Sequence, residues 1–471
     1  MKHVKYKNYV KSIPMIKSNW IEKNIILIST LTSSLIFSIF VTFTSFPIQA
    51  DDYASLVIAN QRPQLSVLDF PELFPRMPIS ILLGLPILSY RIWEIHPKIF
   101  FIFFFSIHAL AVGHLIHYFL SKLFSSQILK NSNSSLFFIL IITLFSLHPN
   151  NYEIHLWHGI ATHSLGAFFV AFSFTSRKNI FRIFGSTAGC LVYDTFPLLL
   201  IGLCCLDGMI SILKKKNQSI GVEVFKKNIF LFVGALSLSS LIKLALLRFT
   251  GTIHNPGFHF LSSHSWQGIY YVLKTTLLIH FYKINWALSL IELSIMSIAM
   301  AITIHLKLFN KIFTGTLGLL TFLAALPLAL MTYPAQRAFY GPNIIKIIVF
   351  SIFIYCLIAF KKYSRLGFIF CFILLLAYLT QWGVICRIKQ SNWKAITQTQ
   401  KHLSLVLAQC QSPCVIRVPP PTQGINRDWV VPQMFWHSFY EWAKLKAAPE
   451  KQVEIQIVEK GYDPEFDQPQ G

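Results

Sequence analysis

The chain has 471 residues, of which 54% are hydrophobic and only 13% are charged. A soluble domain carries roughly 25% charged residues, so this chain has too few of them to cover a water-facing surface. The mean hydropathy of +0.55 agrees with this. These values exclude a soluble enzyme, a disordered chain, a collagen-like fibre and a small disulfide-bonded domain, and they leave a polytopic membrane protein.

The net charge of +22 is unevenly distributed along the chain. Residues 1–390 hold 33 Lys and Arg against 11 Asp and Glu, whereas residues 391–471 hold eight of each kind. The basic residues of the first part form short clusters between apolar runs, which is the pattern of the positive-inside rule and not of a nucleic-acid-binding surface. We therefore predict a transmembrane body over 1–390 and a small extracytoplasmic α/β lobe over 391–471, in which CVIRV and VEIQIV are short β-like runs.

The first apolar run, residues 24–46, is long enough to span a bilayer and shows no convincing cleavage site of a signal peptide. Six lysines precede it, so we place the N-terminus in the cytoplasm. Further basic clusters, assigned to the same side, are 122–130, 177–182, 214–227, 307–311 and 361–365. The other predicted single spans are 98–120, 135–148, 160–176, 228–247, 286–306, 312–332, 343–360 and 366–382.

The stretch 183–213 lies between two basic clusters, so it must enter the membrane and return. We predict a helical hairpin that turns near 193–197, because Pro197 disfavours helix in the residue before it. With 76–94 and 266–283 lying on the membrane surface, the total is about eleven transmembrane helices. This odd number places the C-terminus outside.

Acidic residues are scarce in the body and gather at one side of this topology. The seven on the outer side are Asp51, Asp52, Asp69, Glu72, Glu94, Glu153 and Asp194. Positive-inside sorting by itself leaves acids outside the cytoplasm. An extracytoplasmic active site built from carboxylates is the second interpretation. Glu292 lies within the predicted span 286–306, where a charge is costly in lipid, so we expect it to face the bundle interior.

Asp51 and Asp52 are adjacent and follow the first span directly. Neighbouring carboxylates raise each other's pKa, which can prepare one of them to act as a general base. The alternative is a solvated helix cap, in which an aspartate accepts hydrogen bonds from backbone N–H groups.

The position of this pair resembles the GT-C superfamily of polytopic glycosyltransferases, whose first outer loop carries an acidic motif after the first span. The motif here is ADDYASL at 50–56, in a predicted outer loop over 47–97. Among these enzymes the chain is most similar to the Gtr type II O-antigen glucosyltransferases. The other segments that carry the resemblance are Arg76, Pro97, NNYEIHLWHG at 150–159, LVYDTFP at 191–197 and YPAQRAF at 333–339.

The resemblance implies transfer of a sugar from a polyprenyl-phosphate donor to a lipid-linked glycan, such as O-antigen, at the outer face of a bacterial inner membrane. It implies catalytic roles for Asp51, Asp52 and Glu153. The cations expected to hold the donor phosphate are Arg337, Arg248 and Lys243, and the residues expected to contact substrate are Arg76, Tyr193, Asp194 and Tyr333. Asp194 departs from the pattern, since an uncharged amide is expected after the tyrosine. For Arg337 an ordinary lipid headgroup contact is the alternative.

Histidines surround Glu153. His155 and His158 are three residues apart and share a helix face, so with Glu153 they could hold a divalent metal. Anchoring of the helix end at the lipid headgroups by His and Trp is the alternative. We expect no obligatory cofactor, because a lipid phosphate is a weakly basic leaving group that a cation can stabilise.

Two smaller questions stay open at this point. Cys410 and Cys414 bracket a short loop on the predicted oxidising side, where they form either a disulfide or two free thiols. A transporter or flippase, or a glycan polymerase or ligase, remains an alternative to the transferase.

The orientation can be tested with an enzymatic reporter fused after residue 390. We expect the reporter to be active only outside the cytoplasm, because eleven crossings from a cytoplasmic N-terminus end there. Cytoplasmic activity would contradict the topology and would remove the predicted acidic residues from a common face.

Overall fold

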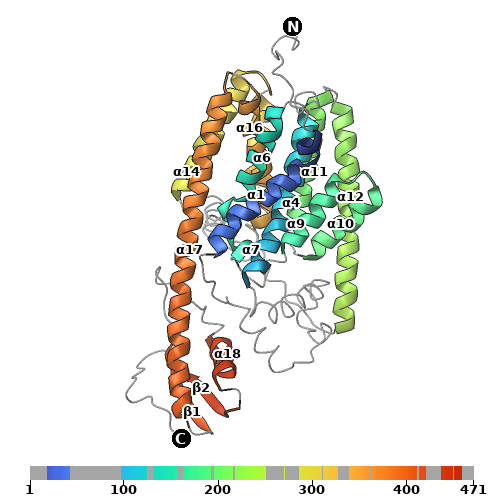
Figure 1. Ribbon diagram of the computed structural model, residues 1–471. Coiled ribbons are helices and arrows are strands. Elements are labelled where there is room, and N and C mark those ends of the chain that lie inside the picture. Colours follow the sequence, from blue (N-terminus) through green and yellow to red (C-terminus); the bar gives the residue numbers. More distant parts are fainter. Residues whose placement is uncertain are drawn as a thin grey trace.

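The computed structural model describes most of the body and part of the C-terminal segment. The described residues are 19–42, 97–124, 132–156, 163–192, 196–215, 218–250, 270, 286–309, 311–326, 339–360, 362–410, 413–420, 436–448 and 450–458. Within them the body is entirely helical (Figure 1). Helices suit a bilayer because each one satisfies its own backbone hydrogen bonds.

The helices of the body fall where the apolar runs predict them. They are α1 (Asn19–Thr42), α4 (Pro97–Leu123), α6 (Ser132–Ser146), the 3₁₀ turn η4 (Pro149–Asn151), α7 (Tyr152–Leu156), α9 (His163–Thr175), α10 (Asn179–Val192), α11 (Phe196–Lys215), α12 (Gln218–Thr250), α14 (Trp286–His305), α15 (Lys311–Leu323), α16 (Tyr340–Ala359) and α17 (Ser364–Gln409). The predicted break of the 183–213 hairpin coincides with the end of α10 and the start of α11.

Seven of the described helices are long and apolar enough to cross a membrane, namely α1, α4, α11, α12, α14, α16 and α17. Three further apolar helices, α6, α9 and α15, are shorter. These helices confirm an all-α, multi-pass membrane protein. The count of eleven crossings remains a prediction.

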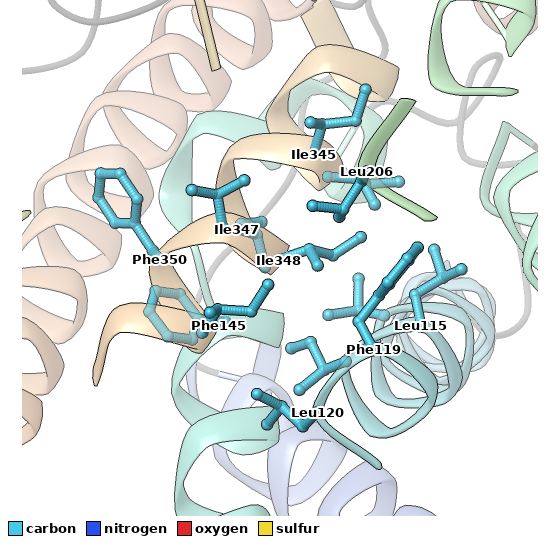
Figure 2. Packing of buried hydrophobic residues seen from close by; sticks show 14 of the residues in the cluster. Leu115, Phe119, Leu120, Phe145, Leu206, Ile345, Ile347, Ile348 and Phe350 are labelled. Atoms are coloured by element: carbon cyan, nitrogen blue, oxygen red, sulfur yellow. The ribbon is translucent and has the colours of Figure 1, made fainter. Parts of the chain in front are cut away.

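Helix α16 forms the centre of the bundle. Every residue from Tyr340 to Ile358 is buried, so no face of the helix is left for lipid. Figure 2 shows its isoleucines against side chains of three neighbouring helices. The labelled partners are Leu115, Phe119 and Leu120 of α4, Phe145 of α6 and Leu206 of α11. Because protein surrounds α16, this helix can carry polar groups that lipid would not tolerate.

The peripheral helices instead expose apolar side chains on one face. In α1 the exposed residues Leu27, Leu31 and Leu35 repeat every four positions. Helix α12 exposes Phe230 and Leu241 in the same way. Such stripes on helices at the edge of the bundle are what contact with lipid chains requires.

Helices α9 and α10 approach each other closely through small residues. A Cβ added at Gly189 would lie 2.5 Å from Val170 Cγ2 and 3.1 Å from the carbonyl oxygen of Gly166. A Cβ at Gly185, one turn earlier, would lie 2.7 Å from Ser173 Cβ. The two glycines form a Gly-x-x-x-Gly pair, which allows two membrane helices to pack backbone against backbone.

Helix α17 connects the bundle to the C-terminal lobe. Its 46 residues span about 69 Å at 1.5 Å per residue, and they run unbroken through residue 390 (Figure 1). Past its end, β1 (Cys414–Val418) pairs in parallel with β2 (Val453–Ile457), and α18 (Trp436–Ala447) packs against α17. Both strands coincide with the β-like runs of the sequence.

A hydrophobic cluster of its own holds this C-terminal part together. Leu403 and Leu407 of α17 are buried with Ile416 of β1 and Phe439 of α18. A disulfide joins Cys410 to Cys414, which settles the choice between disulfide and free thiols. The end of α17 is thereby fixed to the start of β1.

The packing of α9 on α10 can be tested by replacing Gly189 with alanine. We expect Gly189→Ala to lower the free energy of unfolding by about 1–3 kcal/mol, because the new methyl group meets Val170 and a backbone oxygen. The control is Gly234→Ala in α12, where nothing lies within 4 Å of the added Cβ. Thermal unfolding of the purified protein in detergent measures both, and equal melting temperatures would contradict the close contact.

Candidate functional site

Polar residues are buried together in the interior of the bundle. We call this group the polar layer, and it comprises His108, His148, Asn151, His155, Glu292, Tyr340, Asn343, Lys346 and Tyr378. They come from α4, from the turn after α6, and from α7, α14, α16 and α17. A charged or polar side chain is costly in lipid, so its burial inside the bundle needs partners.

Glu292 is the centre of this layer. His148 Nε2 lies 2.8 Å from Glu292 Oε1, and Lys346 Nζ lies 3.4 Å from Glu292 Oε2. The side chains are at most 3% exposed. The sequence predicts that Glu292 faces the bundle interior, and the structure confirms this. One carboxylate therefore joins α14, α16 and the end of α6.

The local structure around His148 fixes the role of its ring. His148 caps the 3₁₀ turn η4, and its Nδ1 accepts a hydrogen bond from the backbone N–H of Asn150 at 3.2 Å. An accepting Nδ1 carries no proton, so the ring proton sits on Nε2, the nitrogen that faces Glu292. His148 can thus act as a donor to Glu292 while it remains neutral.

A second group of contacts lies around His155 in α7. Its ring packs against that of His108 at a centroid distance of 4.5 Å and against that of Phe105 at 4.9 Å. His108 Nδ1 is in turn 2.7 Å from the hydroxyl of Tyr340. Within the described ranges, neither ring nitrogen of His155 has a hydrogen-bond partner. Aromatic packing therefore holds His155 and leaves its two polar atoms unused.

The last turns of α1 reach the same place. Phe37 stacks on Phe105 at 4.1 Å and lies 6.0 Å from the ring of His155. Lys98 Nζ donates to the carbonyl oxygen of Thr42 at 2.5 Å, which ties the end of α1 to the start of α4. The C-terminal end of α1, which precedes Asp51 and Asp52 in the chain, therefore lies near α7.

Most of the predicted site residues lie outside the part of the chain that the structure describes. Those outside the described residues are Asp51, Asp52, Arg76, Tyr193, Asp194, Tyr333 and Arg337. Glu153 belongs to α7, but its side chain is not described. Its roles, and theirs, stay predictions.

Lys243 and Arg248 are the two predicted phosphate ligands whose side chains are described. Both lie towards the C-terminal end of α12, and Arg248 is exposed. Helix α12 packs against α10 and α11 and borders the bundle on the side away from α17 (Figure 1). The structure therefore keeps these two cations apart from the polar layer.

Lys346 is a residue that the sequence analysis missed. It interrupts the apolar run IIKIIVF, and an ionisable residue inside a span marks a buried partner of opposite charge. Glu292 is the acid within a neighbouring predicted span. Two opposite charges within apolar spans suggest an ion pair, so the sequence offered a signal for this contact. The sequence does not show, however, which faces of α14 and α16 meet.

Metal binding has no support within the described part of the chain, where no group of three His, Cys, Asp or Glu side chains could hold an ion. The predicted combination of Glu153, His155 and His158 lies partly outside that part. In comparisons with known proteins, no family model and no curated protein matches the chain.

The coupling between Glu292 and Lys346 can be measured with a double-mutant cycle. Glu292→Gln leaves the ammonium of Lys346 buried without its counter-charge, and Lys346→Met leaves the buried carboxylate without the ammonium that faces it. We expect each change to cost about 3–5 kcal/mol of unfolding free energy, whereas the double variant recovers part of that loss.

Thermal unfolding in detergent provides the measurement, and Glu223→Gln is the matched control, since Glu223 is an exposed acid in α12. We expect the control to unfold like the parent protein. Losses in the double variant that equal the sum of the two single losses would show that the pair is not coupled.

Proposed function

We propose that this protein is a membrane glycosyltransferase of the GT-C type. It transfers a sugar, with glucosyl favoured by the resemblance, from a polyprenyl-phosphate donor to a lipid-linked glycan such as O-antigen. The observation that carries the proposal is the adjacent pair Asp51 and Asp52, which follows the first membrane helix. Pairs of carboxylates after the first span are the acidic motif of this superfamily.

The described part of the structure supports a common location for the proposed catalytic segments. The chain that carries Asp51 and Asp52 leaves α1 after Thr42, and Glu153 stands in α7. Phe37 of α1 and His155 of α7 are in contact at 6.0 Å between rings. The two segments therefore start from neighbouring points at one end of the bundle.

In the proposed reaction one aspartate accepts the proton of the acceptor hydroxyl as its oxygen attacks C1 of the donor sugar. The bond between C1 and the phosphate oxygen breaks, and the polyprenyl phosphate leaves. Arg337 stabilises the leaving phosphate, and its planar guanidinium suits two parallel hydrogen bonds. Glu153 binds a sugar hydroxyl or acts as the second carboxylate.

The proposed topology places this reaction outside the cytoplasm of a bacterial inner membrane. It has eleven crossings, a cytoplasmic N-terminus and an outer C-terminal lobe that helps to bind the acceptor. Three features support it. A helix stands at each predicted span, and the basic residue Lys122 lies in the last turn of α4, at the end opposite to Pro97. The lobe is neutral, as expected of an outer segment. Nucleotide sugars do not cross the membrane, so an outer site requires a lipid-linked donor.

A transporter is the second candidate, and one observation favours it. Glu292, Lys346 and His148 form a buried cluster of ionisable groups, and such clusters mark ion or substrate pathways in many membrane proteins. A transporter would move the lipid-linked sugar without forming a new glycosidic bond. An assay for glycosylated product with the purified protein separates the two candidates, because only a transferase forms that product.

Transfer by the purified protein tests the proposal directly. We expect Asp51→Asn or Asp52→Asn to reduce the transfer rate at least about 10²-fold, the scale of a lost general base. The matched control is Asp69→Asn, which removes the same charge from the same predicted loop. The donor should be a polyprenyl-phosphate sugar, and a nucleotide sugar should give no product.

Two results would contradict the proposal. Parental transfer rates in both Asn variants would remove the aspartates from the reaction. Turnover with a nucleotide sugar alone would overturn the donor class, because such a donor is confined to the cytoplasm.

A further inference from the structure

A basic pocket opens at the end of the bundle away from the polar layer. It has a volume of about 650 Å³ and lies between α4, α10, α11 and α12, beside the end of α9. Lys122 stands fourteen residues beyond His108 in α4, which is about 21 Å along the helix axis. The charged and amide side chains that line the pocket are Lys122, Arg177, Arg182, Asp207, Lys227 and Asn228.

Three basic clusters that are far apart in the sequence meet in this pocket. Lys122 comes from the cluster at 122–130, Arg177 and Arg182 from that at 177–182, and Lys227 from that at 214–227. In the sequence each cluster serves only to orient a neighbouring span. Folding brings four cations and a single acid around one cavity, which leaves an excess of three positive charges.

Asp207 organises the base of the pocket. Its side chain is 4% exposed, and it accepts hydrogen bonds from Lys122, from the Tyr118 hydroxyl at 3.1 Å and from Asn228 Nδ2 at 2.8 Å. Arg182 Nη2 in turn donates to Asn228 Oδ1 at 2.8 Å. One buried carboxylate therefore holds Lys122 directly and Arg182 through an amide.

The donors of these cations are only partly used. Lys122 makes one side-chain bond to Asp207, and Arg182 makes one to Asn228 while it lies over the ring of Phe174 at 5.6 Å. An ammonium has three donors and a guanidinium has five, so among the described residues both keep N–H groups without an acceptor. Within the described ranges, Arg177 and Lys227 have no ion-pair partner, which leaves the excess charge open to an external anion.

We propose that this pocket binds a phosphate-containing ligand that carries at least two negative charges in total. Guanidinium and ammonium groups held in fixed positions match phosphate oxygens, and basic pockets between membrane helices bind lipid phosphates. The volume is also within the range of small-molecule sites. The group belongs either to an anionic lipid or to a soluble phosphate compound, and both offer the same chemistry. The site is separate from the proposed sugar transfer, since it opens at the other end of the bundle.

The test compares two double variants of the full chain, purified in uncharged detergent. Arg177→Gln with Lys227→Gln removes two cations of the pocket. Lys178→Gln with Lys226→Gln removes two cations next to them in the sequence that do not line it. Both variants lose the same net charge, one cation just before α10 and one in α12.

Binding is measured as the saturable rise in melting temperature with ligand concentration, at constant ionic strength. One arm titrates inorganic pyrophosphate, and the other titrates cardiolipin in mixed micelles, with phosphatidylcholine as the uncharged reference. We expect the pocket variant to weaken the apparent Kd by at least about tenfold, the scale of a lost charge-assisted hydrogen bond. The neighbouring variant should change it by less than about twofold, because Lys178 and Lys226 do not line the pocket.

Both arms distinguish the sources of the phosphate. Saturable stabilisation by pyrophosphate supports a soluble ligand, and stabilisation by cardiolipin alone supports a lipid headgroup. Equal weakening of the apparent Kd in the two double variants would overturn the proposal. The basic clusters would then attract anionic lipid only through their general positive charge. The absence of saturable stabilisation by either probe would overturn it as well. Neither outcome depends on sugar transfer.

Discussion

The pairing of Glu292 with Lys346 and His148 is the constraint on which the rest of the bundle depends. An unpaired charge inside a membrane protein is strongly unfavourable. Helices α14, α16 and the end of α6 therefore have to meet where Glu292, Lys346 and His148 can contact one another. Because Lys346 has its counter-charge there, α16 can occupy the centre of the bundle with every face covered. The apolar contacts of Figure 2 then pack around a helix whose position the ion pair has fixed.

The two ends of the bundle differ in the balance of their charges. At one end the polar layer balances its charges internally, and aromatic rings from α1, α4 and α17 enclose His155. At the other end one acid, Asp207, and four cations line the same pocket. A balanced cluster stabilises the fold, whereas an unbalanced one attracts a ligand of opposite charge. For this reason we assign a structural role to the polar layer and anion binding to the basic pocket.

Two further features define the architecture: the close contact between α9 and α10, and the length of α17. Gly185 and Gly189 bring α10 so close to α9 that a Cβ at either position would clash with α9. Helix α17 does the opposite: it leaves the bundle and extends to the C-terminal lobe, where a disulfide and a hydrophobic cluster hold its end. In the proposed function, such a rigid connection keeps an acceptor-binding lobe at a set distance from the membrane.

The sequence by itself determined the class of the fold and the positions of the helices, because lipid forces apolar residues into runs and satisfies no backbone hydrogen bond. It also located both strands of the lobe and the interior position of Glu292. Only the tertiary structure decided that Lys346, 54 residues away, is the partner, and that Lys122, Arg182 and Lys227 share one pocket. Helix α16 is apolar on all sides, so its pattern has no preferred face, and its rotation follows from packing against neighbours that hydropathy does not identify.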